Sequence, residues 1–224
     1  MLENKSYADL LEACAQPGCP VCQLSIRSVR RYLDGILYEG VNDPGIRRAM
    51  RKANGLCNEH GWWLLEGLRN NLGVAILHQD ILLHLAEALE TTSRRQPQRG
   101  SQRDLVNCLS TSAECPACAQ RRTMEEIVIQ SLVEHLDDDE LQTALVNAGG
   151  LCLLHLRCAL ERANEPQRSN CLVQVQLRCW SHLTANLSEF IRKHDYRFRD
   201  EPFGAEADSA RRAIAAVCGE RGVR

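Results

Sequence analysis

The sequence lacks a strong net charge, a long apolar run and a basic, apolar N-terminal segment. Its 29 acidic and 27 basic side chains leave a formal net charge of −2 at pH 7. Such a balance gives no global field to attract nucleic acid or an acidic membrane. No apolar run approaches the roughly 20 residues that span a bilayer, and the N-terminus does not have the pattern of a signal peptide. We therefore expect a cytoplasmic protein with no strong nucleic-acid signal and no membrane association.

Motifs that would indicate catalysis are also missing. The sequence contains no glycine-rich phosphate loop, no His-Glu-x-x-His and no serine elbow. The basic cluster Arg47, Arg48, Arg51 and Lys52 is expected to be a solvated helix face. The matching positions in the second half of the chain are uncharged, which argues against a shared role in nucleic-acid binding. The sequence thus favours a protein without enzymatic activity.

Cysteine, by contrast, is abundant, with 12 residues in a chain that is 44% hydrophobic and 25% charged. This composition is ordinary for a globular protein that buries a sizeable core. In a reducing compartment, cysteines serve as metal ligands or buried thiols rather than as a disulfide framework.

Two motifs each occur twice, and they organise the chain. Cys-Pro-x-Cys precedes Cys-x-x-His by 35 positions (57 − 22) in the first half and by 34 (152 − 118) in the second. Positions i and i+3 share a helix face, so each motif presents two ligands together. We predict one metal site in each copy, with three cysteines and one histidine: Cys19, Cys22, Cys57 and His60 in the first, and Cys115, Cys118, Cys152 and His155 in the second.

Three thiolates and one imidazole suit a closed zinc site, whereas iron–sulfur clusters usually take four cysteines. We therefore expect two Zn²⁺ ions per chain, with an iron–sulfur cluster as the less favoured alternative. A set of buried thiols and core histidines is the other interpretation. Cys14 and Cys108 precede the cysteine pairs and are expected to be core residues, although each is also an alternative ligand or resolving thiol.

Apolar residues recur at helical spacing throughout, which predicts an all-α fold of two tandem pseudo-repeats, each a small bundle built around its metal site, with long C-terminal helices. The predicted parts are a first repeat over 1–91, a polar linker over 92–103, a second repeat over 104–195 and a C-terminal clamp segment with a helix over 196–224. In the clamp, extended backbone would turn the rings of Tyr196 and Phe198 toward a core groove. Arg197 and Arg199 would then pair with carboxylates such as Glu39 and Glu134 and hold the two halves together. Alternatively, they would face an anionic ligand or partner, or Asp200 and Glu201.

The same motifs carry a resemblance. Cys-Pro-Val-Cys at 19–22, Val-Asn-Asp-Pro at 41–44, Gly-Leu-Cys-Asn-Glu-His at 55–60, their second-copy equivalents and the segment 193–202 are similar to an uncharacterised bacterial family of duplicated helical proteins. The resemblance covers nearly the whole chain and implies a shared fold and metal binding, but no activity.

Two functions remain at this stage. The first is a zinc-binding cytoplasmic helical scaffold with an adaptor or regulatory role and a protein partner. The alternative is a thiol-redox or metal-responsive protein, in which the Cys-Pro-x-Cys pairs release metal on oxidation. Four matched ligands per site favour the scaffold, because a dithiol enzyme would not need Cys57, His60, Cys152 or His155.

Overall fold

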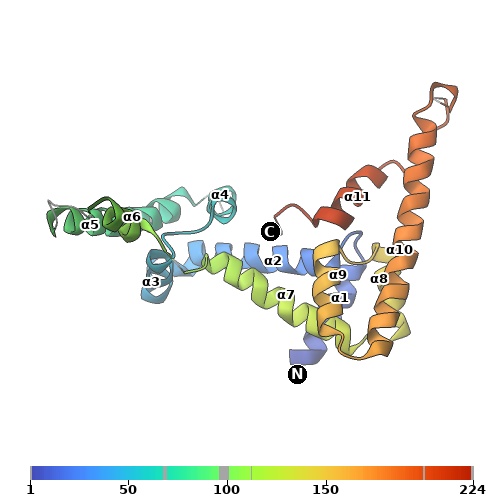
Figure 1. Ribbon diagram of the computed structural model, residues 1–224, viewed down its shortest axis with the longest axis horizontal. Coiled ribbons are helices and arrows are strands. Elements are labelled where there is room, and N and C mark those ends of the chain that lie inside the picture. Colours follow the sequence, from blue (N-terminus) through green and yellow to red (C-terminus); the bar gives the residue numbers. More distant parts are fainter. Residues whose placement is uncertain (1, 68–69, 96–100, 112, 199, 223–224) are drawn as a thin grey trace. The chain divides into compact units, whose positions relative to one another are not determined.

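The computed structural model confirms the all-helical prediction. It describes residues 2–67, 70–95, 101–111, 113–198 and 200–222, and these contain eleven α-helices and no strand (Figure 1). The chain forms two compact units, Met1–Ile26 with Thr123–Arg224 (unit 1) and Arg27–Arg122 (unit 2). These units take residues from both predicted repeats, and the tandem repeat itself stays a prediction from motif spacing.

Unit 1 contains one contiguous core built from both ends of the chain. Buried Leu10, Cys22, Leu132, Leu145 and Leu172 belong to the same apolar cluster. Helix α8 contacts α1 and α10, and α11 contacts α9 and α10. The elements of this unit are α1 (Leu2–Cys14), the first part of α2 (Pro20–Gly35), the second part of α7 (Pro116–Glu134), α8 (Asp139–Ala148), α9 (Leu153–Arg162), α10 (Pro166–Lys193), a 3-10 turn (Tyr196–Phe198) and α11 (Ser209–Cys218).

Unit 2 has its own smaller core, which includes Val29, Leu33, Leu64, Leu77 and Ala117. Helix α5 contacts α3, α4 and α6. The elements of this unit are the rest of α2, a π-helical turn (Ile36–Gly40), α3 (Pro44–Lys52), α4 (Asn58–Glu66), α5 (Asn71–Arg95), α6 (Ser101–Leu109) and the start of α7.

Local sequence signals account for where several helices begin and end. Helices α2, α3, α7 and α10 all start at a proline, the residue that the first helical position tolerates best. Asp43 caps α3 by accepting from the backbone N–H of Ile46 at 2.7 Å. Helix α8 ends at Gly149, whose φ of 100° is the left-handed conformation that favours glycine.

Helix α5 is the one described helix that is long and apolar enough to cross a membrane, with a mean hydropathy of 1.3 over Asn71–Arg94 and only 17% of that window buried. This finding qualifies the expectation that no stretch approaches that length. An acidic residue in its middle, Asp80, has carboxylate oxygens 2.9 Å from Arg51 Nε and 3.6 Å from Arg47 Nη1. These ion pairs link α5 to α3, so the basic cluster of α3 is not entirely a solvated face.

The C-terminal segment differs from the predicted clamp. Tyr196–Phe198 is a 3-10 turn rather than extended backbone, and the Tyr196 ring is 80% exposed instead of docked. Arg197 binds Asp195, with Nη2 2.6 Å from the carboxylate, in place of Glu39 or Glu134. Pairing with Asp195, two residues away, is favoured over pairing with a distant carboxylate because closing a short loop costs little entropy. Arg199 lies outside the described residues.

The segment is instead fastened to the end of α10. Lys193 Nζ lies 2.6 Å from Glu206 and 2.8 Å from the carbonyl oxygen of Pro202. The Arg192 guanidinium lies over the Phe198 ring, 4.4 Å from its centroid. The chain after α10 is therefore held to unit 1 by charge and aromatic contacts.

Candidate metal centres

Unit 1 brings two helix N-termini and four candidate ligands together. Cys19 directly precedes α2 and Cys22 lies in its first turn, while Cys152 caps α9 and His155 lies in the first turn of α9. Ligand atoms of these four residues all lie within 4.8 Å of one another, and all four residues are buried. We refer to this set as centre 1.

Unit 2 contains the matching set, which we call centre 2. Cys57 caps α4 and His60 lies in its first turn, whereas Cys115 and Cys118 lie at the start of α7. Their ligand atoms are again all within 4.8 Å of one another. His60 is buried, but the three cysteines are only partly buried.

The eight predicted residues thus form two sets of three cysteines and one histidine, but their grouping is crossed. The first Cys-Pro-x-Cys pair meets the second Cys-x-x-His pair in centre 1, and the reverse combination forms centre 2. The prediction of one site within each copy is therefore wrong.

The length of α2 explains the crossing. Its 16 residues extend about 24 Å at 1.5 Å per residue, and they lead away from the cysteines at its start. The chain then passes through the π-helical turn and α3 before it reaches Cys57. In unit 2, Ala117 at the start of α7 shares a core with Val29 and Leu33 in the second half of α2. The nearest thiol pair for Cys57 is consequently the one at the start of α7.

The distances fit a tetrahedral ion. Around zinc, with Zn–S of about 2.3 Å and Zn–N of about 2.0 Å, two sulfurs lie about 3.8 Å apart and sulfur and nitrogen about 3.5 Å apart. In centre 1, Cys22 Sγ lies 3.7 Å from Cys152 Sγ, and His155 Nδ1 lies 3.2–3.4 Å from the three sulfurs. In centre 2, the Sγ atoms of Cys57 and Cys118 are also 3.7 Å apart, and His60 Nδ1 lies 3.2–3.6 Å from the sulfurs. Nδ1 is therefore the nitrogen that faces the sulfurs in both sets and that would bind an ion.

The electrostatics of centre 1 also suit a cation. Burial raises the pKa of the Cys19 thiol to about 12. Hydrogen bonds with Cys152 and Cys19 raise the pKa of Cys22, and hydrogen bonds from Cys19 and Cys22 lower the pKa of Cys152. Burial by itself lowers the pKa of His155, but contacts with Cys152, Cys22 and Glu125 outweigh it and raise this pKa to about 11. The lowered pKa of Cys152 favours its thiolate form, and a divalent ion bound by this set would displace the protons of the other thiols.

In centre 2, too, the pKa of one thiol is lowered and that of another is raised. Burial alone raises the pKa of Cys115, but a hydrogen bond with His60 and three backbone amides lower it to about 6. Burial, and then the negative charge of Cys115, raise the pKa of Cys118 to about 12. The positive ends of two helix dipoles, those of α4 and α7, add to the stabilisation of thiolate in this centre.

Residues around the two histidines differ. Glu125 of α7 has its carboxylate oxygen 3.4 Å from His155 Nε2, within ion-pair distance. His60 instead has the ring of Trp63 edge-on to its own, with centroids 5.5 Å apart. Trp62, the residue before Trp63, is 58% exposed. No sequence signal points to Glu125, because it lies on a different helix from His155 and belongs to no motif.

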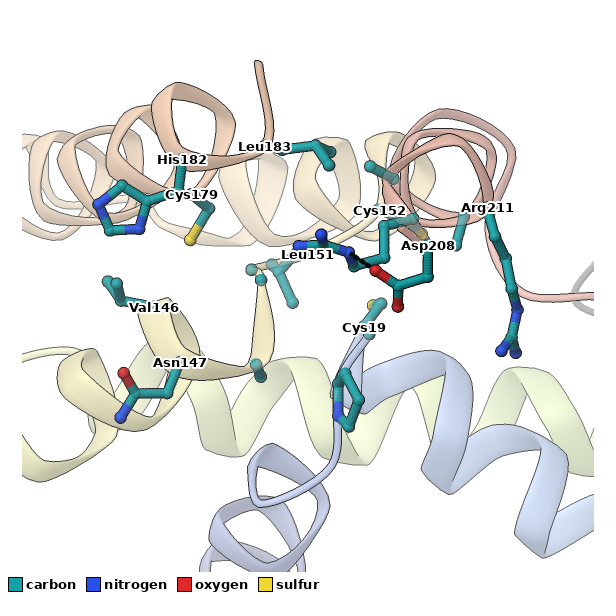
Figure 2. A pocket seen from close by; sticks show the side chains of 18 of the residues that line it. Cys19, Val146, Asn147, Leu151, Cys152, Cys179, His182, Leu183, Asp208 and Arg211 are labelled. Carbon is teal, nitrogen blue, oxygen red and sulfur yellow. Dashed lines mark hydrogen bonds and ion pairs between the residues drawn. The ribbon is translucent and has the colours of Figure 1, made fainter. Parts of the chain in front are cut away.

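A cavity of about 340 Å³ lies beside centre 1, under α11 (Figure 2). Figure 2 shows Cys19 and Cys152 at its inner wall, with Cys179 and His182 contributed by α10. Although they line this cavity, Cys19 is only 4% exposed and Cys152 only 1%. Helix α11 therefore contributes to keeping centre 1 away from solvent.

The remaining cysteines belong to neither set. Cys14 is 3% exposed and packs in the core of unit 1, where burial raises the pKa of its thiol to about 12. Cys108 donates to the carbonyl oxygen of Leu105 at 3.1 Å. Cys14 agrees with the expectation of a core residue, whereas Cys108 is only partly buried and belongs to neither core cluster.

Comparisons with known proteins agree with the resemblance seen in the sequence. No solved structure matches the chain. A protein described as an uncharacterized 23.9 kDa protein in the xynA 3′ region, from Caldicellulosiruptor sp. (strain Rt8B.4), is 25% identical over 191 residues, which cover 84% of this chain and 88% of the relative. The model of a family of unknown function, DUF6062, matches residues 8–223. Since this match spans nearly the whole chain, the protein belongs to the DUF6062 family.

Proposed function

We propose that this protein is a zinc-binding helical scaffold that holds two Zn²⁺ ions per chain and acts in the cytoplasm as an adaptor or regulator. The observation that carries the proposal is the agreement of sulfur–sulfur and sulfur–nitrogen separations with a tetrahedral ion in both centres.

The donor set favours zinc over iron. Zinc sites with three thiolates and one imidazole are a common closed arrangement, whereas iron–sulfur clusters usually require four thiolates. Four protein ligands also fill a tetrahedral shell and leave no position for substrate. This saturation supports a structural role rather than metal-assisted catalysis.

The crossed grouping supports a scaffold. Cys22 and Cys152, whose sulfurs meet in centre 1, are 130 positions apart in the sequence, and Cys57 and Cys118 in centre 2 are 61 apart. A metal ion that joins such distant segments stabilises the folded chain much as a cross-link would, because closure of a long loop is entropically costly.

The adaptor role is supported by exposed apolar side chains on the helices of unit 2. Trp62 of α4 is 58% exposed, and Leu72, Leu82 and Leu83 of α5 are 64–72% exposed. Apolar surface of this kind marks protein interaction sites when it is contiguous. The cytoplasmic assignment is supported by the twelve cysteines, all of which are free thiols.

A second candidate function, a thiol-based redox or metal-responsive protein, is favoured by one observation. The thiols of centre 2 are partly exposed, and the pKa of Cys115 is lowered to about 6, which increases its thiolate fraction at neutral pH. Reversible zinc release from centre 2 under mild peroxide would favour this candidate over the scaffold.

Elemental analysis combined with thermal melting tests the proposal. We expect two zinc ions and no iron per chain, and a large decrease in melting temperature in the presence of a strong chelator. A chain that contains no metal and melts at the same temperature with and without chelator would show that the clusters are held by hydrogen bonds. A visible absorption band with iron and sulfide would instead indicate an iron–sulfur protein.

A further inference from the structure

The two metal centres differ in how well their ligands are covered. All four side chains of centre 1 are at most 4% exposed. In centre 2 only His60 is buried, and Cys57, Cys115 and Cys118 are partly exposed. Competing ligands in solution therefore reach the sulfurs of centre 2 more readily than those of centre 1.

The two centres also differ in the groups that surround the histidine Nε2 atom, the ring nitrogen that does not face the sulfurs. When Nδ1 binds a metal, the ring proton lies on Nε2 and needs an acceptor. Both Nε2 atoms are buried, and neither makes a hydrogen bond among the described residues. His155 Nε2 nevertheless has the Glu125 carboxylate at ion-pair distance, 3.4 Å, whereas no carboxylate of the described residues lies at such a distance from His60 Nε2. Only centre 1 thus has a carboxylate close enough to orient its imidazole.

The sequence explains this asymmetry. Glu125 lies seven positions after Cys118 on α7 (125 − 118), and the residue seven positions after Cys22 on α2 is Val29 (29 − 22). Val29 is 1% exposed and belongs to the core of unit 2. Helix α7 therefore has a carboxylate, that of Glu125, seven positions after its cysteine pair, whereas α2 has the apolar side chain of Val29 at the same spacing.

We propose that centre 2 is an exchangeable zinc site and centre 1 a retained one, with Glu125 as the positioning residue that fixes His155 in centre 1. This inference rests on the proposed zinc-binding function and assigns different roles to its two sites. In the exchange step, a competing chelator takes the zinc ion, and the freed thiolates of centre 2 take up protons from water. No electron transfer is involved.

The effect of Glu125 on the zinc affinity of centre 1 can be estimated from other metal sites. Outer-shell carboxylates that hold a ligating histidine typically change metal affinity by about 10- to 100-fold. Glu125→Gln keeps the size of the side chain and an oxygen acceptor but removes the charge. Glu126→Gln is a matched control, because Glu126 is the adjacent residue of α7 and is exposed.

The test is thiol labelling of the full-length zinc-loaded protein during metal removal. The chelator is 4-(2-pyridylazo)resorcinol, which reports released zinc by its colour, and each cysteine alkylated by N-ethylmaleimide is identified by peptide mass spectrometry. Cys218 is exposed and serves as an internal reference for reagent activity. We expect one zinc ion to leave first, together with labelling of Cys57, Cys115 and Cys118, while the thiols of centre 1 stay protected.

In Glu125→Gln, we expect labelling of the centre 1 cysteines to become about 10- to 100-fold faster and that of Cys57 to stay unchanged. In Glu126→Gln, both rates should equal those of the wild type. Simultaneous release of two zinc ions, or earlier release from centre 1, would contradict the inference and leave the proposed zinc binding intact. Equal rates in both variants would show that Glu125 does not position His155. A chain that takes up no zinc would overturn the proposed function as well.

Discussion

Replacing Cys22 by serine removes one of the four ligands of centre 1, and the structure indicates how large the effect should be. Cys22 is fully buried, with its sulfur 3.7 Å from Cys152 Sγ and 3.4 Å from His155 Nδ1. One ligand in four of a site that contributes about 10–16 kcal/mol corresponds to about 3–4 kcal/mol. A buried hydroxyl without a partner costs about 1–3 kcal/mol more.

The sum, about 4–7 kcal/mol, is a large fraction of the 5–15 kcal/mol that typically stabilises a domain. For a domain of this size, we expect the melting transition of unit 1 to fall by about 15 °C or more, or folding of unit 1 to fail. Calorimetry with elemental analysis measures both effects. Centre 2 should keep its zinc, because none of its ligands is changed. Cys152 should become reactive toward N-ethylmaleimide while Cys57 stays protected.

Cys14→Ser is the matched control, since Cys14 is also a buried thiol of unit 1 but belongs to neither centre. Its cost should be limited to the buried hydroxyl, about 1–3 kcal/mol, with two zinc ions retained. The reasoning would be refuted if both variants melted alike, or if Cys22→Ser exposed Cys57 rather than Cys152.

Three further predictions concern unit 1, each measured by thermal melting. Gly150→Ala should destabilise by about 1–3 kcal/mol, because φ is +81° and the added Cβ would lie 2.8 Å from a glutamine oxygen; an unchanged melting temperature would contradict this. Glu206→Gln should destabilise at neutral pH, since Lys193 and backbone amides lower the pKa of Glu206 from 4.5 to about 2. This contribution is present above pH 4.5 and is lost as the pH falls toward 2, so a difference independent of pH would exclude the ion pair as its cause. Tyr7→Phe should cost about 1 kcal/mol, because the hydroxyl donates to Asp138, and the cost should vanish in the Asp138→Ala background.

Much of the fold could be predicted from the sequence because its signals are local. The cap of α3 at Asp43 and the helix starts at prolines depend on neighbouring residues alone. Helical spacing of apolar residues alone does not show where the stretch after Leu56 is interrupted. The structure divides it into α4 and α5, and α4 ends at Gly67.

The composition of the two centres could be predicted from spacing, but their grouping could not. Positions i and i+3 at a helix start place two ligands together, and this holds whichever partner pair completes the site. Which Cys-x-x-His pair meets which Cys-Pro-x-Cys pair depends on where α2 and α7 end in space. Spacings of 35 and 34 residues favoured a site within each copy and led to the wrong grouping.

Contacts between distant segments were also beyond the sequence. Nothing around Glu125 indicates that its carboxylate faces His155, 30 positions later (155 − 125) and on another helix. The preferred partners of Arg197 were the distant carboxylates of Glu39 and Glu134, whereas the residue pairs with Asp195, two positions away. An alternating pattern of rings and arginines did not reveal that the backbone forms a 3-10 turn there.

X-ray absorption at the zinc edge, together with the metal content of the same sample, tests the central claim most directly. The account predicts two zinc ions per chain, with an average first shell of three sulfurs at about 2.3 Å and one nitrogen at about 2.0 Å. Zinc bound mainly through oxygen, or a chain that folds fully without any metal, would contradict it.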